Sequence, residues 1–472
     1  FLHVSGLDIY QNSAGWGGAI YLADDSTIDF DNENLCNVYN NNAGKGADII
    51  VQDMGPVDVI VDTFSVFEPS RYFAEYLEGS TYTFSIQNSW MELEPNDLYV
   101  AEDGNDNNSG LTPNDPLKNI SWAVRKIQAE EQNSRTVHVA AGTYSWSSNQ
   151  QIFPIGCKEY VSIIGEDMEN TILFNELNTE AILGAYLNGF TEISNFSISN
   201  SSEMNTELVI FGYEIDMFKL SNIMIQNNSN IRRILFTEHV TNLFDNLIIT
   251  DNTADRNAAL SLNENSGVMK NCVISNNTLI FTTHGYEAVM QLDAHDDEEF
   301  IVENCVFSNN NTTSFDSRII RTRSGWGEEP TIKFNNCLFS DNSTNYNTFM
   351  DVFNQGITEF NNCTFINNTS SYSTLKGYGD IIMNNTIMHD NTNYEIFMAD
   401  WTPVSQETYK LTVDYSNIQN GENGIYNENG VNTINWGVGN IDEDPFFLLS
   451  GDHPYQLSEL SPCIDTGTLD LP

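Results

Sequence analysis

The chain has 472 residues, of which 66 are Asp or Glu and 18 are Lys or Arg, so its formal net charge is −48. This excess argues against nucleic acid and anionic membrane surfaces as partners, because phosphate groups are bound by clustered basic side chains. The sequence contains no run of about 18 apolar residues, so it predicts no transmembrane helix. No signal peptide is visible. The composition fits an exposed, extracellular protein.

The first 53 residues have the pattern of short strands entered through glycine or asparagine. Gly17–Leu22 is one such strand, and Asn40–Val51 combines an asparagine turn with a second strand. These stretches resemble the Gly-Gly-Ala-Ile coils of surface β-helices in bacterial adhesins and autotransporter-like proteins. We therefore predict that residues 1–53 are the terminal coils of an upstream β-helix, and that the chain is a mature or cleaved piece of a longer one.

Residues 54–96 lose the asparagine-rich period. Val57–Val66 and Thr81–Ile86 alternate apolar and polar side chains, as half-buried strands do, and Pro56 and Pro69 interrupt the pattern. The sequence predicts antiparallel strands here, in a β-rich connector between two β-helical parts.

A new unit is predicted to begin at about residue 97, where a strand, a turn-rich loop, a helix and two further strands follow in order. The segments are Leu98–Val100, Asp103–Gly110, Leu117–Ala129, Val137–Tyr144 and Tyr160–Gly165. This order resembles the opening of secreted right-handed parallel β-helix domains of the pectate-lyase-like superfamily, in which the helix plugs the N-terminal end. A cap is also expected physically, because an open end exposes unpaired strand edge and apolar core. We assign residues 97–135 to this cap and residues 97–472 to one β-helix domain.

One short phrase recurs eight times between Asn195 and Asn391, and each copy begins with an anchor asparagine. The anchors are spaced 27, 24, 25, 33, 32, 26 and 23 residues apart, at Asn195, Asn222, Asn246, Asn271, Asn304, Asn336, Asn362 and Asn385. A repeat of this length indicates a solenoid. Apolar residues alternate within each copy, so each copy contributes a strand, and one such strand per coil predicts an all-β parallel β-helix.

The alternation predicts two inward columns of side chains. The first is Phe196, Ile223, Leu247, Cys272, Cys305, Cys337, Cys363 and Thr386, and the second is Ile198, Ile225, Ile249, Ile274, Phe307, Phe339, Phe365 and Met388. The four stacked cysteines are predicted to be buried free thiols that act as small hydrophobes, because other apolar residues share their column.

A third column consists of asparagines that lie six residues after the anchors. Asn tolerates left-handed backbone at a turn, and stacked amides can hydrogen-bond from coil to coil. The column therefore predicts a structural ladder at a bend rather than a binding site. Its members are Asn228, Asn252, Asn277, Asn310, Asn342, Asn368 and Asn391.

The end of the chain departs from the repeat. Gly439–Phe447, Tyr455–Leu457 and Ser461–Gly467 follow one another there. They resemble the closing module of the same secreted β-helix proteins, which a surface-anchoring or secretion-sorting tail often follows. We assign residues 436–472 to this module.

The resemblance makes cleavage of pectin-type polysaccharides the enzyme hypothesis. A lyase uses Arg or Lys as its base and commonly acidic calcium ligands, whereas a hydrolase uses two carboxylates across a groove. Neither the Arg318–Arg323 stretch nor the Arg232-Arg233 pair matches a lyase catalytic segment, and the paired-Asp and Gly-His-Gly patterns of polygalacturonase-like enzymes are missing, so no catalytic residue is assigned. Salt-bridged arginines are the simpler interpretation of these basic residues, and a solvated loop is the simpler interpretation of one acidic stretch. The candidate ligand-binding residues are Arg318, Arg321 and Arg323 among the basic residues, and Asp293, His295 and Asp296 in the acidic stretch.

Calcium is the one cofactor that the sequence suggests. Asp103, Asn105 and Asn107 have the 1, 3, 5 spacing of an oxygen-ligand loop. Positions 6 and 12 of the pattern are Asn108 and Asn114, where an EF-hand has Gly and Glu. A purely structural turn remains the alternative interpretation.

Taken together, the sequence predicts an extracellular or cell-surface β-helix protein with a structural or adhesive role, as a module of a larger envelope or filament assembly. The alternative is a secreted polysaccharide lyase or glycoside hydrolase acting on acidic glycans, and a passive carbohydrate-binding module is a third hypothesis. The predicted partners are an extracellular glycan and other copies of the same protein, which would dock head to tail through unpaired coil ends.

Overall fold

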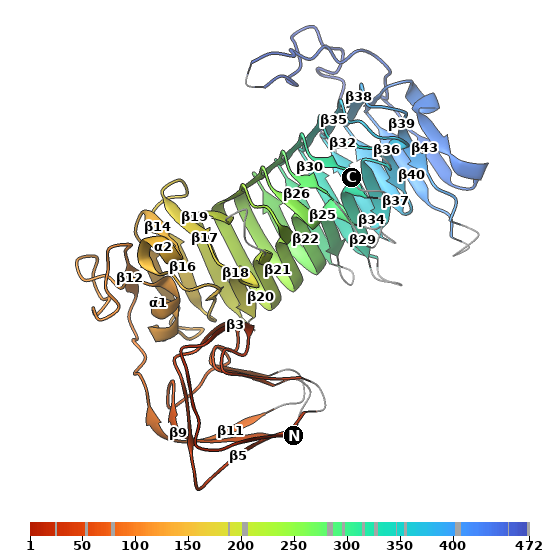
Figure 1. Ribbon diagram of the computed structural model, residues 1–472. Coiled ribbons are helices and arrows are strands. Elements are labelled where there is room, and N and C mark those ends of the chain that lie inside the picture. The colour runs from red at the N-terminus through yellow and green to blue at the C-terminus, as the bar shows by residue number, and fades with distance from the viewer. Residues whose placement is uncertain are drawn as a thin grey trace. The chain divides into compact units, whose positions relative to one another are not determined.

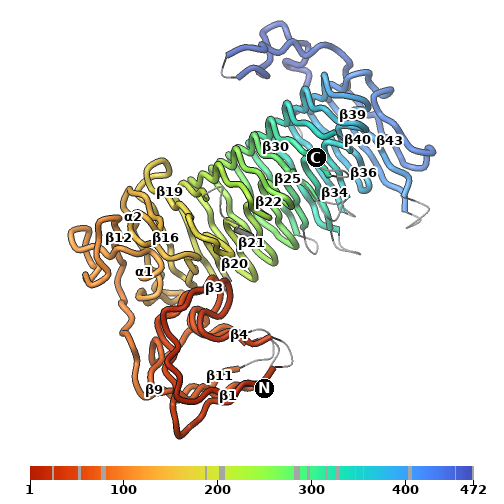
Figure 2. Tube along the Cα trace, in the orientation of Figure 1, coloured from red at the N-terminus to blue at the C-terminus, as the bar shows by residue number. Residues whose placement is uncertain are grey.

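The computed structural model describes residues 1–23, 26–51, 55–76, 81–186, 189–200, 206–280, 287–294, 298–313, 317–324, 329–345, 347–353, 356–401, 407–451 and 453–469. The chain forms two compact units, Phe1–Met224 and Ile225–Pro472. In each unit short parallel strands stack coil on coil (Figures 1 and 2). Crossovers between parallel strands are right-handed in nearly all proteins, so the chain is a right-handed parallel β-helix, which is the predicted fold class. Within the described residues, no helix is long and apolar enough to span a membrane.

The first unit begins with small stacked sheets. Their strands are β1 (Leu2–Val4), β2 (Asp8–Tyr10), β3 (Ser13–Trp16), β4 (Ile20–Leu22), β5 (Ile28–Phe30), β6 (Cys36–Tyr39), β7 (Asn42–Lys45), β8 (Ile49–Val51), β9 (Val57–Phe64), β10 (Ala74–Tyr76) and β11 (Tyr82–Ser89). The prediction of antiparallel strands in residues 54–96 is wrong, because β9 pairs with β6 and with β11 in parallel. Strands β9 and β11 continue the stacking of the coils before them, but their coils lack the repeated asparagine phrase.

A longer solenoid follows in the same unit. Its strands are β12 (Leu98–Val100), β13 (Arg135–Val139), β14 (Gly142–Tyr144), β15 (Ile155–Gly156), β16 (Val161–Gly165), β17 (Thr171–Asn175), β18 (Ala181–Tyr186), β19 (Phe190–Asn200) and β20 (Thr206–Gln226). The capping helix is α1 (Ile120–Lys126), shorter than predicted, because the side chain of Asn119 accepts a hydrogen bond from the Ser121 N–H and sets its start. A one-turn helix, α2 (Trp146–Asn149), follows.

The cap also contacts the first coils. Nη1 of Arg125 in α1 donates to Oδ1 of Asn40 at 2.7 Å, and Nζ of the buried Lys158 donates to the Ile127 carbonyl at 2.6 Å. Asn42 Nδ2 donates to the Pro154 carbonyl at 2.9 Å. Buried polar groups need such partners, and these bonds join Asn40 to the cap, the cap to Lys158, and Asn42 to the strands that follow the cap.

The second unit starts with the long strands β21 (Ile231–Thr250) and β22 (Thr253–Lys270) and continues as four columns. One column is β26 (Glu299–Glu303), β30 (Thr331–Asn335), β34 (Ile357–Asn361), β37 (Asp380–Asn384), β40 (Lys410–Asp414) and β43 (Thr433–Trp436). The next is β23 (Val273–Ser275), β27 (Val306–Ser308), β31 (Leu338–Ser340), β35 (Thr364–Ile366), β38 (Ile387–His389) and β41 (Asn417–Ile418). A third, of two-residue strands, is β24 (Thr278–Leu279), β28 (Asn311–Thr312) and β32 (Ser343–Thr344). The fourth is β25 (Ala288–Ala294), β29 (Arg318–Ser324), β33 (Met350–Phe353), β36 (Ser373–Gly377), β39 (Tyr394–Met398) and β42 (Ile425–Asn427).

The predicted inward columns are confirmed. Their members in the second unit's repeats, from Cys272 and Ile274 to Thr386 and Met388, are at most 3% exposed. Rings of the second column stack directly, with centroids 5.0 Å apart for Phe307 and Phe339 and 4.4 Å apart for Phe339 and Phe365. The repeat thus builds a continuous core, with each coil burying the one before it.

The asparagine ladder, defined as Asn228, Asn252, Asn277, Asn310, Asn342, Asn368 and Asn391, is also confirmed as a hydrogen-bonded structure. The backbone N and the Nδ2 of Asn277 both donate to Oδ1 of Asn310 at 3.1 Å, and Nδ2 of Asn310 donates to the Ile274 carbonyl at 2.8 Å. The left-handed backbone lies elsewhere than predicted: the anchors have φ of +50° to +64°, as do the residues just before the ladder, such as Asn309 at +55°.

The prediction that the cysteine column consists of buried free thiols is confirmed, and the thiols also take part in hydrogen bonds. All four are free and buried, yet Sγ of Cys305 accepts the Cys272 N–H at 3.4 Å and donates to the Glu303 carbonyl at 3.2 Å. Thr386 and Ser416 continue the same pattern with hydroxyls, since the Thr386 N–H donates to Oγ of Ser416 at 3.1 Å. A side chain that both accepts and donates is needed because each turn leaves a backbone N–H inside the core.

We predict that Asn310→Ala lowers the free energy of unfolding by several kcal/mol, because buried donors left without partners cost about 1–3 kcal/mol each. Urea unfolding followed by circular dichroism measures the loss. Ser308→Ala, two residues away on the partly exposed side of β27, is the control and should change stability by less than about 0.5 kcal/mol. Equal effects of the two substitutions would show that the ladder is not a source of stability.

A second pair of variants tests the thiol column. Cys305→Ser keeps an acceptor for the Cys272 N–H, whereas Cys305→Ala leaves that buried donor unpaired at a cost of about 1–3 kcal/mol. We expect the serine variant to have the higher melting temperature. If alanine is the better tolerated replacement, the thiol acts as the apolar filler that the sequence suggested.

Candidate functional site

The fourth column of the second unit carries an unusual row of side chains on its outer face. Strands β29, β33, β36, β39 and β42 are aligned so that Arg321, Asp351, Lys376, Phe397 and Tyr426 occupy one level on successive coils. Their neighbours Ile320, Met350, Leu375 and Ile396 are buried in the core. Since side chains alternate across a strand, the charged and aromatic row points out of the solenoid, where Arg321, Asp351 and Phe397 are nevertheless at most 8% exposed.

The charged part of this surface, here called the arginine face, consists of Asp293, Arg318, Arg321, Arg323, Asp351 and Lys376. Nε of Arg318 lies 2.7 Å from Oδ2 of Asp351, and Nε of Arg323 lies 3.8 Å from Oδ2 of Asp293. Asp351 is 1% exposed, and its Oδ1 has no hydrogen-bond partner among the described residues. The face therefore holds a buried carboxylate oxygen that can still accept a hydrogen bond.

The other part of the surface is an aromatic cluster of Phe353, Tyr372, Tyr378, Phe397, Trp401 and Tyr426. Nζ of Lys376 lies 4.8, 5.0 and 5.5 Å from the ring centroids of Tyr378, Tyr372 and Phe397. The guanidinium carbon of Arg321 lies 5.7 Å from the ring centroid of Phe353. Cations at these distances from ring faces are attracted by the ring quadrupole, so the cations are held in place by aromatic contacts as well as by carboxylates.

Burial shifts the pKa values of two groups on this surface. Desolvation lowers the pKa of Arg321 to about 10 despite its attraction to Asp351, so the guanidinium stays charged at neutral pH. Burial likewise raises the pKa of Tyr378, which keeps its hydroxyl neutral. Arg323, with a side chain 42% exposed, and Tyr372 and Tyr426, 43% and 39% exposed, are the groups that a ligand in solution can reach.

The structure brings together four of the predicted ligand-binding residues, namely Arg318, Arg321, Arg323 and Asp293. His295 and Asp296 lie outside the described residues. Sequence analysis missed Asp351 and Lys376, although alignment by coil could have found them: Arg321, Asp351 and Lys376 follow Cys305, Cys337 and Cys363 by 16, 14 and 13 residues. The changing loop length between columns concealed this alignment.

The predicted calcium loop is held by its own contacts. Asp103, Asn105 and Asn107 are exposed, and Oδ1 of Asn105 accepts hydrogen bonds from N and Nδ2 of Asn107 at 3.0 and 3.1 Å. This is an asparagine turn, and its contacts give the calcium hypothesis no support. Among the described residues, His, Cys, Asp and Glu form no group of three or more that could hold a metal ion.

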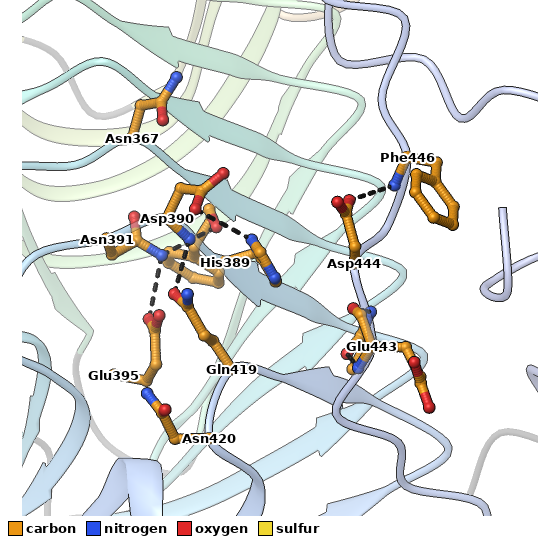
Figure 3. A network of polar contacts seen from close by, with 12 residues as sticks. Asn367, His389, Asp390, Asn391, Glu395, Gln419, Asn420, Glu443, Asp444 and Phe446 are labelled. Carbon is orange, nitrogen blue, oxygen red and sulfur yellow. Dashed lines mark hydrogen bonds and ion pairs between the residues drawn. The ribbon is translucent and has the colours of Figure 1, made fainter.

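A second polar cluster lies where the asparagine ladder ends (Figure 3). Nδ2 of Asn391 donates to Oε2 of Glu395 at 2.9 Å, and Nδ1 of His389 lies 3.3 Å from Oδ1 of Asp390. Glu395 is 2% exposed, and burial raises its pKa to about 7. A carboxyl group shielded in this way cannot reach a polymer substrate, so we interpret it as the terminus of the ladder.

Comparison with known proteins places the chain in a family. The family described as "Protein of unknown function (DUF1565)" matches residues 102–345, which are 244 of the 472 residues, so the chain belongs to this family. No curated protein matches it.

Solved structures with the same kind of fold include two polysaccharide enzymes. The Azotobacter vinelandii mannuronan C-5 epimerase AlgE4 A-module is 16% identical, with a TM-score of 0.44 over 66% of this chain and 90% of that one. Pectate lyase Pel9A is 14% identical, with a TM-score of 0.45 over 80% of this chain and 93% of that one. ORF18 of Geobacillus virus E2 is 14% identical, with a TM-score of 0.37 over 68% of this chain and 56% of that one. At these identities the likeness is one of fold alone.

We expect Glu395 to make the free energy of unfolding depend on pH. Its pKa in the folded protein is about 7, above the value near 4.3 expected in an unfolded chain, so the folded state binds the proton more tightly between these limits. Its contribution to stability is therefore greatest below about pH 4.5 and is lost as the pH rises through 7.

We expect Glu395→Gln, which keeps an acceptor for Asn391, to raise the free energy of unfolding at pH 8 and to lose that advantage by pH 5. Urea titrations of both proteins at each pH measure the difference. The matched control is Glu422→Gln, since Glu422 is exposed and its replacement should change stability by less than about 0.5 kcal/mol. A Glu395→Gln difference that is flat from pH 5 to 8 would contradict the assignment.

Proposed function

We propose that this chain is an extracellular, structural or adhesive β-helix protein that binds an extended, carboxylate-bearing glycan along the arginine face. The observation that carries the proposal is that accessible groups of this surface lie on coils several steps apart: Arg323 on β29 and Tyr426 on β42, with β33, β36 and β39 between them. Accessible groups spread along a solenoid suit a linear polymer better than a compact ligand.

The chemistry of the row supports this ligand class. Guanidinium groups pair with carboxylates through two parallel hydrogen bonds, and Arg323 is accessible for such a contact. Exposed aromatic rings such as Tyr426 and Tyr372 present apolar faces on which the C–H face of a sugar ring can stack. Successive coils are spaced by about 4.8 Å, so side chains on neighbouring coils can contact neighbouring sugar units.

The large negative charge of the protein does not oppose this proposal at short range. Charges separated by more than about 8 Å are largely screened at physiological salt. A carboxylate within contact distance of Arg323 or Lys376 therefore responds mainly to those groups and to Asp293 and Asp351 beside them.

We predict that Arg323→Ala and Tyr426→Ala each weaken binding of a polyuronate oligosaccharide by about tenfold, which corresponds to about 1.4 kcal/mol. Isothermal titration calorimetry with oligogalacturonate and oligomannuronate measures the effect. Lys410→Ala is the control, because Lys410 is an exposed cation on β40, in another column of the same unit, and its removal should leave affinity unchanged. Equal losses for all three variants, or no binding by the unmodified protein, would refute the proposal.

A second candidate function is cleavage of the same glycan. It is favoured by the gathering of Arg318, Arg321 and Arg323 on one strand beside Asp351, because a lyase uses Arg or Lys as the base that takes the proton beside the uronate carboxylate. Incubation with polygalacturonate, with and without Ca²⁺, tests for unsaturated products by their ultraviolet absorbance. Product formation that Arg321→Lys reduces would make the protein an enzyme, and its absence would leave binding as the function.

The adhesive role also includes contacts between copies of the chain. Coil ends can pair head to tail and so form fibres. Light scattering and electron microscopy of the intact protein test this part, since a particle that stays monomeric at high concentration would refute it.

A further inference from the structure

The C-terminal segment, described over residues 441–451 and 453–469, crosses the outer face of the column that contains β27, β31, β35 and β38. Side-chain amides hold its backbone at two points. Asn417 donates to the Glu443 carbonyl at 2.7 Å and accepts from its N–H at 3.2 Å, and Asn385 makes the same pair of bonds with Thr468, both at 2.8 Å. Between these points the Tyr455 hydroxyl bonds Asp341 at 2.6 Å.

Two adjoining cavities, of about 600 and 780 Å³, lie between this segment and the coils. Both are lined by Asn362, Thr364 and Tyr455, so they form one channel, here called the C-terminal channel. Its floor is the row Val306, Leu338, Thr364 and Ile387, which the strand register aligns on successive coils.

The size of the channel is not that of a packing defect. Protein interiors rarely contain voids larger than a water molecule, whereas small-molecule sites measure roughly 300–1,000 Å³. Hydrogen bonds hold the segment at Glu443, Tyr455 and Thr468. Between these residues the segment does not pack closely against the apolar floor. The channel is thus a shaped space of the size that a ligand fills.

The lining defines the chemistry of an occupant. Tyr415, Phe447 and Tyr455 supply aromatic surface, and Asn362 supplies an amide. Nδ2 of Asn362 and the Tyr415 hydroxyl make no hydrogen bond with the described part of the chain, so both can bond a ligand. The described lining residues include Asp341 and Asp465 but neither Lys nor Arg, which disfavours an anion.

We propose that the C-terminal channel is a second carbohydrate site, which binds a neutral saccharide of a few sugar rings. Apolar floor and aromatic walls take the C–H faces of the rings, and amides, hydroxyls and carboxylates take their hydroxyl groups. The site is independent of the arginine face, because the two use different strand columns and opposite charge preferences.

The test uses the full chain and panels of neutral oligosaccharides (gluco-, xylo- and manno-oligomers), with binding measured by saturation-transfer NMR and calorimetry. Thr364→Trp places a large ring in the part of the channel that both cavities share, and should weaken binding of the neutral ligand by at least about tenfold. Thr412→Trp, at a similarly half-buried position on β40, is the matched control and should have no effect.

Two further variants keep the result interpretable. Asn362→Asp removes the amide donor with little change of shape, and Tyr415→Phe removes only a hydroxyl; each should weaken binding several-fold even if Thr364→Trp perturbs the fold. Arg323→Ala should leave neutral-saccharide binding intact, and Thr364→Trp should leave polyuronate binding intact, so failure of one site is distinguishable from failure of the other. The proposal is overturned if no neutral oligosaccharide binds, if the channel variants bind like the unmodified chain, or if an extended peptide binds there instead.

Discussion

The structure depends on hydrogen bonds that run from coil to coil inside the solenoid. A parallel β-helix turns its backbone sharply in every coil, and each turn leaves an N–H group pointing into the core. The asparagine ladder satisfies one such row, with Oδ1 of Asn310 accepting two bonds from Asn277. The cysteine column satisfies another, with Sγ of Cys305 accepting the Cys272 N–H. Without these acceptors, each coil would add buried unpaired donors to the core.

This constraint separates the scaffold from the functional surface. Residues that bond the next coil must recur at one register, so they vary little along the chain. Residues on the outer face of the fourth column are not under this constraint, and they differ from coil to coil, from Arg321 to Asp351 to Lys376. A solenoid can therefore change what it binds without changing how it folds, and we propose the arginine face and the C-terminal channel as two such surfaces.

The predictability of the fold follows from the same physics. Periodic features such as Phe307, Phe339 and the ladder asparagines were recognisable because stacking forces them to repeat. The thiol hydrogen bonds were not, because the alternation of Cys305 with apolar residues looks the same for a filler and for an acceptor. The parallel pairing of β9 and β11 was missed because their two coils lack the repeated phrase.

Prediction of the site was partial for a different reason. The arginines stood out as rare cations in an acidic chain, and three of them do lie on one face. Asp351 and Lys376 belong to no recognisable sequence pattern. Only the register between β29, β33 and β36 shows that they lie next to Arg321 on successive coils. The C-terminal channel had no sequence signal at all, since it arises where the closing module folds back over residues about 100 positions earlier, as Tyr455 does over Asp341.

The most direct test of the account is a crystal structure of the chain with a polyuronate oligosaccharide bound. We predict an extended chain lying across β29, β33, β36, β39 and β42, with a carboxylate at Arg323 and a sugar ring against Tyr426 or Tyr372. An oligosaccharide bound on another column, with the arginine face empty, would contradict it.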